Sequence, residues 1–376
     1  MARSEAVEKA AHARKGGRAG RRTAPPSPCE LSFGETAGLR QVTLANGVVR
    51  AEILLDKGAN VRQFWHVPTG ARALAKTHDW AERLAEFHRS GYRGSSYSDC
   101  YEGGWQDVLP ARAEWDGGAT GDGAGVGEAA IVPSELMHAA CTPAAAQVLC
   151  RARLPRCGLE VAKRFVIRRG VAALLVQTTV RNVSGRDVRL SWTQHPALGG
   201  DLLDDTSRVL LPGGRLVANR EGQESGSGGS VAGCVSDKAD HWLSARALLP
   251  TGSADSFRTF ANVERSHAAL LSHAWGVGVK LRWDKVTFPH AWLWSARRES
   301  ICCIAVEPST TYLPEMSGCP GSPILQLLQP GDSLSTWVEL STFTLASGLS
   351  PDAALQRGTH SGSPSVDDRY WTMAGV

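Results

Sequence analysis

Period-two alternation of apolar and polar residues, interrupted by short turns that contain glycine, is the feature that most constrains this fold. The clearest run covers three consecutive segments: 159–167, 171–182 and 186–193. Within the first segment, alternate positions are apolar at Leu159, Val161, Phe165 and Ile167. Successive side chains of a strand point to opposite faces, and glycine permits the tight turns between strands. The pattern therefore predicts an antiparallel meander.

Further strands and a single helix are consistent with the same architecture. Apolar or alternating runs that end at turn signals occupy three other segments: 48–55, 61–67 and 334–340. Residues 78–90 have the spacing of an amphipathic helix, and two glycine-rich stretches, 116–127 and 221–233, predict loops. Because no repeat or linker divides the body, we predict one large all-β domain of stacked, mostly antiparallel sheets.

The charge distribution separates the ends of the chain from its body. Residues 1–30 hold seven of the 41 basic and three of the 37 acidic residues, so the remainder carries 34 of each sign. Residues 1–30 contain almost no large apolar side chain and predict a disordered basic tail. An organelle-targeting segment is the alternative, which Glu5 and Glu8 disfavour. We expect the sandwich domain over 31–348 and a C-terminal tail, partly disordered, over 349–376.

Composition favours a soluble cytoplasmic protein without a nucleic-acid or membrane partner. We expect a monomer or a homodimer, although composition does not decide between them. The sequence lacks an apolar run of membrane-spanning length and a signal-peptide core, and its body is electrically neutral. Its nine cysteines include no Cys-x-x-Cys pair and are typical of a reducing compartment. Motifs for nucleotide binding, zinc proteolysis and serine hydrolysis are absent, and no metal-ligand cluster stands out.

Two lone titratable residues lie where apolar runs meet a proline. His195 precedes Pro196, and Glu307 precedes Pro308 after the apolar run Ile-Cys-Cys-Ile-Ala-Val. We expect both side chains at strand ends, where they can leave the core and enter a cleft. Taken alone, a lone histidine is more often a core residue satisfied by backbone, and a strand-end glutamate can be merely solvated. The apolar neighbours of Glu307 favour a buried position.

The order of these segments resembles that of the aldose 1-epimerase (galactose mutarotase) family. Four segments within about residues 35–345 carry the resemblance: 101–110, 180–199, 288–308 and 329–332. The resemblance implies a β-supersandwich and an enzyme that interconverts sugar anomers by opening and closing the ring. It also implies that His195 is the acid, that Glu307 is the base, and that no cofactor is needed. Ring opening needs an acid at the ring oxygen and a base at the anomeric hydroxyl, with the roles reversed on closure.

The first half of the presumed site departs from that family. Where the family has a histidine before two glycines, this chain has Glu102 before Gly103 and Gly104. The resemblance then implies that Glu102, Trp105 and Gln106 face a small-molecule sugar substrate. The family's sugar-binding aspartate has only a weak counterpart, Asp240.

Other residues are candidates for sugar contact. Trp294 could stack on the sugar, although burial is the commoner use of an indole, and Trp105 carries the same alternative. Arg93 could bind a hydroxyl or an anionic substituent, with a surface salt bridge as the simpler alternative. A phosphorylated or sulfonated sugar would need at least two converging arginines, and the available ones are Arg93, Arg112, Arg220 and Arg258.

Two other functions remain compatible with the sequence. One is a non-catalytic carbohydrate-binding protein on the same scaffold, because fold alone does not fix function. The other is a polysaccharide lyase or hydrolase module, which would need a long open cleft and a further catalytic tyrosine or carboxylate. The sequence offers no obvious second catalytic pair, so this last hypothesis ranks below the others.

Overall fold

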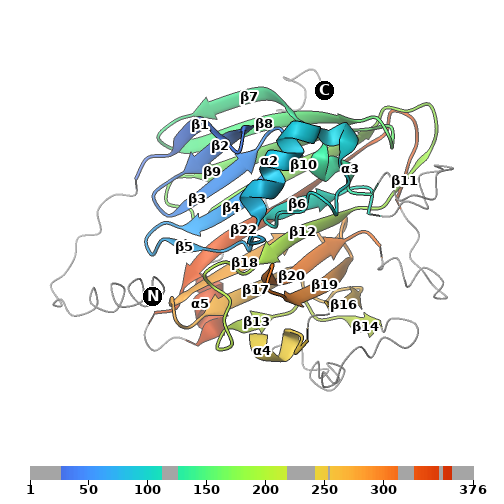
Figure 1. Ribbon diagram of the computed structural model, residues 1–376. Helices are drawn as coiled ribbons and strands as arrows, with labels where there is room; N and C mark the ends of the chain where they lie inside the picture. Colours follow the sequence, from blue (N-terminus) through green and yellow to red (C-terminus); the bar gives the residue numbers. More distant parts are fainter. Residues whose placement is uncertain are drawn as a thin grey trace.

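Two stacked antiparallel sheets form the body of the protein (Figure 1). The computed structural model describes residues 27–111, 126–217, 242–252, 255–311, 326–346 and 350–357. Among these residues, the larger sheet has 11 strands in the order β1-β2-β3-β4-β6-β12-β20-β19-β16-β14, with β5 paired to β4. The smaller has nine, in the order β15-β13-β17-β18-β22-β10-β9-β8-β7, and β11 pairs separately with β21. This architecture confirms the predicted all-β sandwich.

The elements have the following bounds. The strands of the larger sheet are β1 (Glu30–Thr36), β2 (Leu39–Ala45), β3 (Val49–Leu54), β4 (Asn60–His66), β5 (Ala71–Arg72), β6 (Trp105–Val108), β12 (Thr193–Leu198), β14 (Arg215–Val217), β16 (Ser256–Ala261), β19 (His290–Arg297) and β20 (Cys302–Ser309). The strands of the smaller sheet are β7 (Glu135–Cys141), β8 (Ala145–Leu154), β9 (Leu159–Arg168), β10 (Ala173–Asn182), β13 (Arg208–Leu210), β15 (Leu243–Ser244), β17 (His267–Ser272), β18 (Val277–Trp283) and β22 (Ser333–Thr344). The remaining elements are β11 (Val188–Leu190), β21 (Gln326–Leu328), α2 (Trp80–Ser90), η1 (Tyr92–Gly94), α3 (Glu128–Ile131), α4 (Ala245–Leu248) and α5 (Pro351–Arg357).

The predicted meander is confirmed in its first two strands and altered in its third. Strands β9 and β10 pair along their length and turn at Gly170, whose φ of +70° is readily available to glycine. The third segment, 186–193, divides instead: β11 pairs with β21 outside the two large sheets, and β12 begins at Thr193 in the larger sheet. The chain thus crosses from the smaller sheet to the larger one within a few residues.

The main apolar core lies between the two sheets. Its members alternate along the strands with residues that face outward, as in Val148, Phe165 and Val176 of the smaller sheet and Val42 and Leu44 of the larger. Burial of a large aromatic side chain such as Phe165 stabilises the fold, and truncating such a side chain to alanine typically costs about 3–5 kcal/mol of unfolding free energy.

A buried polar network lies within this core and joins the two sheets. Asp107 of β6 accepts a hydrogen bond from Trp192 Nε1 at 2.8 Å and another from the amide of Gln194. Lys163 of β9 forms an ion pair with the second oxygen of Asp107 at 2.5 Å. Because every polar atom of this carboxylate has a donor, the network can be buried without leaving an unpaired charge. It fixes β6 and β12 against the smaller sheet.

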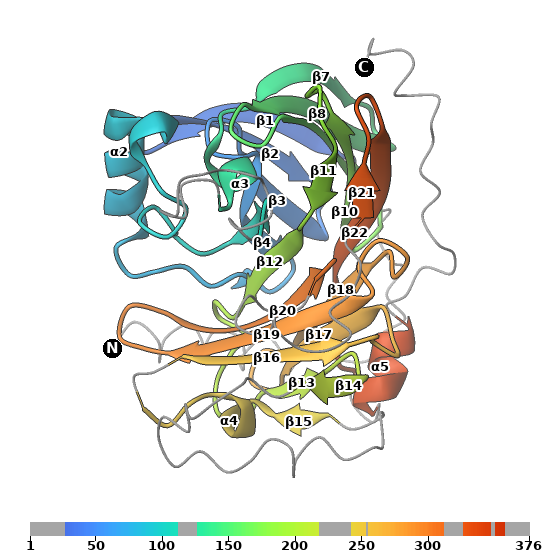
Figure 2. The same ribbon diagram turned by 90° about the vertical axis from the view of Figure 1, so that its right-hand side faces the viewer.

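Helix α2 covers the opposite, outer face of the larger sheet. Figure 2 shows α2 on the side of β2–β4 that faces away from β10 and β22. Leu84 and Phe87 of α2 pack on Leu39 and Leu54 of the sheet, which confirms the predicted apolar face of this helix. The helix thereby closes one end of the outer face.

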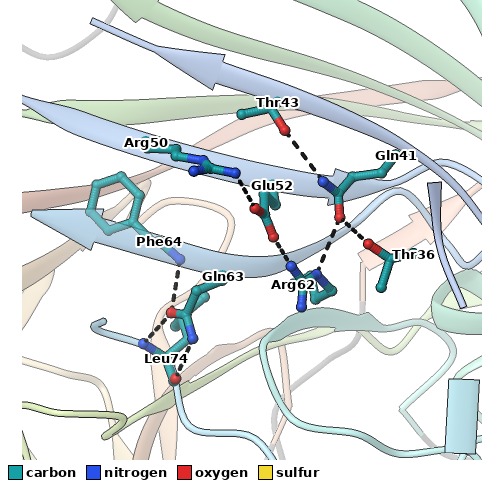
Figure 3. A network of polar contacts seen from close by, with 9 residues as sticks. All are labelled: Thr36, Gln41, Thr43, Arg50, Glu52, Arg62, Gln63, Phe64 and Leu74. Carbon is teal, nitrogen blue, oxygen red and sulfur yellow. Dashed lines mark hydrogen bonds and ion pairs between the residues drawn. The ribbon is translucent and has the colours of Figure 1, made fainter. Parts of the chain in front are cut away.

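A network of polar side chains lies beside α2 on this outer face (Figure 3). Glu52 accepts hydrogen bonds from Arg50, at 2.6 Å, and from Arg62. The guanidinium of Arg62 also lies 5.1 Å from the ring centroid of Trp80 at the start of α2. In the same view, the Gln63 amide bonds the backbone N–H and carbonyl of Leu74, each at 3.0 Å. This clamp holds the segment after β5 against β4.

The predicted chain ends are described only in part. Residues 1–26 and 358–376 lie outside the described residues, as do 112–125 and 218–241, which include most of the two glycine-rich stretches. Beyond residue 348 the chain forms α5, whose Ala354 and Leu355 pack against Phe343. None of the described helices is long and apolar enough to cross a membrane.

Candidate functional site

A row of side chains crosses five strands on the outer face of the larger sheet. Strand register places Gln106 opposite His195, Glu307 opposite Trp292, and Trp292 opposite Thr259. His195 and Glu307 lie midway between the flanking pairs Thr193–Ser309 and Ala197–Ala305 of β12 and β20, which sets them across from each other. Directly opposed residues of antiparallel strands project from the same face, and neighbouring strands are about 4.8 Å apart. The row therefore gathers residues that are up to two hundred positions apart in the sequence.

His195 and Glu307 face each other in this row. Nε2 of His195 lies 3.4 Å from Oε1 of Glu307, and the two side chains are 13% and 4% exposed. Both lie inside strands, which corrects the expectation that a proline ends each strand here. Pro196 and Pro308 each lack an N–H, and the ladder between β12 and β20 omits residues 194–196. The two prolines loosen the ladder beside the pair without ending either strand.

Burial shifts the titration of both members of the pair. It lowers the pKa of His195 to about 4 and raises the pKa of Glu307 well above its usual value. A neutral imidazole beside a protonated carboxyl holds the same protons as an imidazolium beside a carboxylate. In the protein alone, burial favours the neutral arrangement, whereas the roles that the resemblance implies, His195 as acid and Glu307 as base, require the charged one. The pair can therefore pass a proton without changing its net charge.

Three aromatic rings enclose His195. The ring centroids of Trp294 and Tyr101 lie 5.2 and 5.3 Å from that of His195, and Tyr97 lies at 6.5 Å. The residues beside the pair on this face are Ala197 and Ala305, whose small side chains project little from the sheet. The rings thus form walls around a sheet face that carries only small side chains beside His195 and Glu307.

The two tyrosines approach both carboxyl groups. Burial raises the pKa of Tyr97, and the charges of Glu307 and Glu102 add to this effect. The pKa of Tyr101 is raised by burial first, and then by groups that include Cys303, Tyr97 and both carboxyls. The sequence analysis missed these residues because they lie between η1 and β6, where no periodic pattern marks a face.

Glu102 and Gln106 form the other side of the site. Oε2 of Glu102 accepts hydrogen bonds from Lys57 Nζ at 2.5 Å and from Gln106 Nε2 at 3.0 Å. Gly103 and Gly104 have φ of +94° and +79°, and a Cβ on Gly103 would lie 2.3 Å from the carbonyl oxygen of Ala75. The glycine pair thus permits the close backbone packing that brings Glu102 and Gln106 together.

Unpaired buried polar atoms are concentrated here. Within the described part of the chain, five buried atoms around the pair have no hydrogen-bond partner: Glu102 Oε1, Gln106 Oε1, His195 Nδ1 and the hydroxyl oxygens of Tyr97 and Tyr101. Buried polar atoms in folded proteins are nearly always paired, because each unmade hydrogen bond costs about 1–3 kcal/mol. A cluster of such atoms is typical of a site that binds water or a polar ligand.

Of the other predicted sugar contacts, one lies in the site and two lie away from it. Trp294 lies in the site, and its Nε1 donates to Asp255 at 2.9 Å. Trp105 lies on the opposite face, in the main core, where its Nε1 donates to Gln194 at 2.7 Å. Arg93 is exposed and contacts its neighbour Tyr92. Trp105 and Arg93 therefore do not meet His195 and Glu307.

The remaining candidates give no cationic cluster in the site. Asp240, Arg112 and Arg220 lie outside the described residues. Arg258 alternates with Thr259 along β16 and so projects from the other face. Within the described ranges, no group of three or more His, Cys, Asp or Glu side chains could hold a metal ion.

Comparisons with known proteins place this geometry in context. The sequence model of one protein family, described as Domain of unknown function (DUF4432), matches residues 144–342. No curated protein matches the sequence. Solved structures do match: a Klebsiella pneumoniae protein provisionally assigned as an aldose 1-epimerase has a TM-score of 0.59 and 14% identity, covering 84% of this chain and 82% of that one.

Two further structures agree with this likeness. A galactose mutarotase-like protein from Clostridium acetobutylicum gives a TM-score of 0.56 at 12% identity, covering 84% of this chain and 99% of its own. A GalM/aldose epimerase homologue from C. elegans gives 0.55 at 12% identity, covering 84% and 100%. At such identities the likeness establishes the fold alone, which is the galactose mutarotase-like sandwich.

Proposed function

Because this chain belongs to the DUF4432 family and folds as a galactose mutarotase-like sandwich, we propose that it is a cofactor-independent aldose 1-epimerase-like enzyme. The observation that carries the proposal is the His195–Glu307 contact of 3.4 Å, enclosed on a sheet face among five unpaired polar atoms. An acid and a base held close together in one site are what anomer exchange requires.

The pair would act by moving two protons across the sugar. Protonated His195 gives a proton to the ring oxygen while ionised Glu307 takes the proton of the anomeric hydroxyl. The bond between the anomeric carbon and the ring oxygen breaks, and the electrons of the O–H bond form the aldehyde carbonyl. His195 is then neutral and Glu307 protonated, the arrangement that burial favours in the protein alone. Closure on the other face of the aldehyde reverses both transfers and gives the other anomer.

Sugar hydroxyl groups would complete the site. Hydrogen bonds from hydroxyls to the Glu307 carboxylate would stabilise its ionised form and so offset its burial before ring opening. Glu102 and Gln106 would accept hydrogen bonds from further hydroxyls, and Trp294 would stack on the sugar. We do not extend this role to Trp105 or Arg93, which lie away from the pair.

The polar atoms around the pair favour a neutral sugar over an anionic one. The unpaired oxygens of Glu102 and Gln106 are acceptors, which suit hydroxyl donors and repel phosphate or sulfonate. Moreover, Arg62 and Lys57 are already paired with Glu52 and Glu102. We therefore propose a neutral aldose as the substrate.

A non-catalytic carbohydrate-binding protein is the second candidate. The aromatic rings around His195 and the unpaired acceptors would serve binding as well as catalysis. The two functions differ in one observable. A binding protein would change its tryptophan fluorescence with sugar while leaving the rate of anomer exchange at the uncatalysed value.

Anomer-exchange NMR tests the enzyme proposal. The purified protein is assayed with a panel of hexoses and with their 6-deoxy, 6-phospho and 6-sulfo derivatives. We expect accelerated exchange of neutral sugars, reduced about 10²- to 10⁴-fold in Glu307→Gln, because the base is lost while the shape is kept. Arg93→Ala, an exposed substitution, is the control and should retain the wild-type rate. Equal rates in wild type and Glu307→Gln would refute the assignment.

A further inference from the structure

Lys57 is a fully enclosed lysine at the edge of the candidate site. Its side chain has 0% exposure, that of its partner Glu102 has 2%, and the Nζ–Oε2 distance is 2.5 Å. The ring of Phe87 on α2 lies 5.6 Å from Nζ. A charge in this position is strongly desolvated, so the lysine depends on its carboxylate partner.

The two carboxylate oxygens of Glu102 have different numbers of hydrogen-bond donors. Oε2 takes both donors, Lys57 and Gln106, whereas Oε1 has no partner among the described residues. The amide nitrogen of Gln106 donates to Glu102 and to the carbonyl of Gly103 at 2.9 Å, which leaves Gln106 Oε1 as a second unpaired acceptor. Two neighbouring groups therefore each present one free acceptor oxygen.

The second buried lysine of the sandwich shows what a purely structural pair looks like here. Lys163 contacts Asp107 at 2.5 Å, and its Nζ also donates to the carbonyl of Gly58 at 2.7 Å. Both oxygens of Asp107 have donors, because Trp192 and Gln194 bind the one that Lys163 does not. The Lys57 pair differs from it in leaving an acceptor free on the site side.

Both ends of the Lys57 pair are rigidly held. Gly58, with φ of +64°, packs so closely on α3 that a Cβ would lie 2.5 Å from the carbonyl oxygen of Ala129. Asn60 donates to the carbonyl of Ala130 at 2.8 Å, which anchors the turn that carries Lys57. Glu102 is anchored by the Gly103–Gly104 packing described above. A fixed cation on one side and a fixed amide on the other leave the carboxylate a single orientation.

From this geometry we infer that Lys57 is a positioning residue, which fixes the orientation of the Glu102 carboxyl group so that Glu102 and Gln106 together receive two neighbouring hydroxyls of the sugar. This inference rests on the proposed function, because it assigns the specificity of the same site. The Lys57–Glu102–Gln106 group would select sugars by hydroxyl pattern, while His195 and Glu307 carry the proton transfers.

The test compares four variants with the full-length wild type. They are Lys57→Met, Glu102→Gln, the double variant Lys57→Met/Glu102→Gln, and Lys163→Met as the matched buried-lysine control. Affinity for D-glucose, D-galactose and D-mannose and for their monodeoxy analogues is measured by tryptophan fluorescence, and exchange rates are measured by NMR. Glu102→Gln and the double variant keep the test valid if Lys57→Met alone does not fold.

We expect KM and Kd to rise about 10- to 100-fold in Lys57→Met and Glu102→Gln, as for loss of hydrogen bonds to a charged group. The value of kcat should change only a few-fold, because the acid–base pair is untouched. Wild type should bind two of the monodeoxy analogues as weakly as Glu102→Gln binds the parent sugar. Lys163→Met should lose stability but keep its affinity within about two-fold, since its carboxylate partner does not face the site.

Each outcome separates this inference from the proposed function. Sugar affinity that is unchanged in folded Glu102→Gln would overturn the role of Lys57 while leaving the enzyme proposal intact. Affinity that depends on Glu102 without accelerated exchange would support the role of Lys57 and reject catalysis. If wild type binds none of the three sugars, both proposals are rejected.

Discussion

Each member of the His195–Glu307 pair costs stability in a different pH range. The pKa of His195 is lowered to about 4, so its native form resists protonation between about pH 6.5 and 4, where the unfolded chain takes up a proton. The pKa of Glu307 is raised, so above about pH 4.5 the unfolded chain releases a proton that the native state retains. Stability is therefore lost on acidification because of His195 and on alkalinisation because of Glu307.

Replacement of Glu307 by glutamine should separate function from stability. At pH 8, Glu307→Gln should have a larger free energy of unfolding than wild type, because the amide has no proton to lose on unfolding. The gain should shrink as pH falls toward 4.5. Urea unfolding of both proteins at pH 5 and pH 8 measures it, and a variant less stable than wild type at pH 8 would contradict the assigned pKa direction.

The sequence identifies a site residue when its own neighbours in the chain indicate burial, and it fails when the burial comes from distant elements. Apolar flanks marked Glu307 as buried, and this is confirmed at 3% exposure. For His195, the local sequence alone favoured a structural histidine in the core. Only the order of segments along the chain indicated that Glu307 is its partner. Lys57 was not found, because a lysine in a turn gives no sign of burial until α2 and α3 cover it.

At the scale of elements, turn chemistry and alternation predicted hairpins well. The β9–β10 hairpin and helix α2 lie where the sequence placed them. The interruption of the ladder between β12 and β20 was not predictable in the same way. A proline normally marks a strand end, and whether it can remain inside a strand depends on which ladder positions its partner leaves unbonded.

The segment at Gly103 offers an element-scale test. A methyl group there would meet the backbone of Ala75 and Lys76 at 2.3 and 2.8 Å, in addition to the strain of φ +94°. We expect Gly103→Ala to destabilise the fold by about 2 kcal/mol or more in urea unfolding and to weaken sugar binding through Glu102. Gly34→Ala is the control, because a Cβ at Gly34 has no atom within 4 Å. Equal stability of the two variants would contradict the close packing described here.

At the scale of the whole molecule, the site depends on long-range strand order. Strands β6, β12, β20 and β19 are neighbours in the sheet although they come from three separate parts of the chain, since only β19 and β20 are consecutive. Alternation alone predicts strands and faces, but it cannot say which distant strands pair. The all-β class was therefore predictable from local patterns, whereas the row of site residues needed the sheet order that folding establishes.

The strand order also has a consequence for catalysis, because it sets His195 and Glu307 side by side. If register brings His195 and Glu307 together as one acid–base unit, then removing either should abolish the same concerted step. If the residues act separately, their losses should add. Groups that share a function show this non-additivity clearly in mutant kinetics.

The most direct measurement is a double-mutant cycle on catalysed anomer exchange, using wild type, His195→Ala, Glu307→Ala and the double variant. We predict that each single variant loses nearly all the acceleration, about 10²-fold or more, and that the double variant is no slower than the singles. Circular dichroism of the four proteins would check that each is folded. Independent, additive losses, or a single variant that keeps the wild-type rate, would contradict the account of His195 and Glu307 as one catalytic pair.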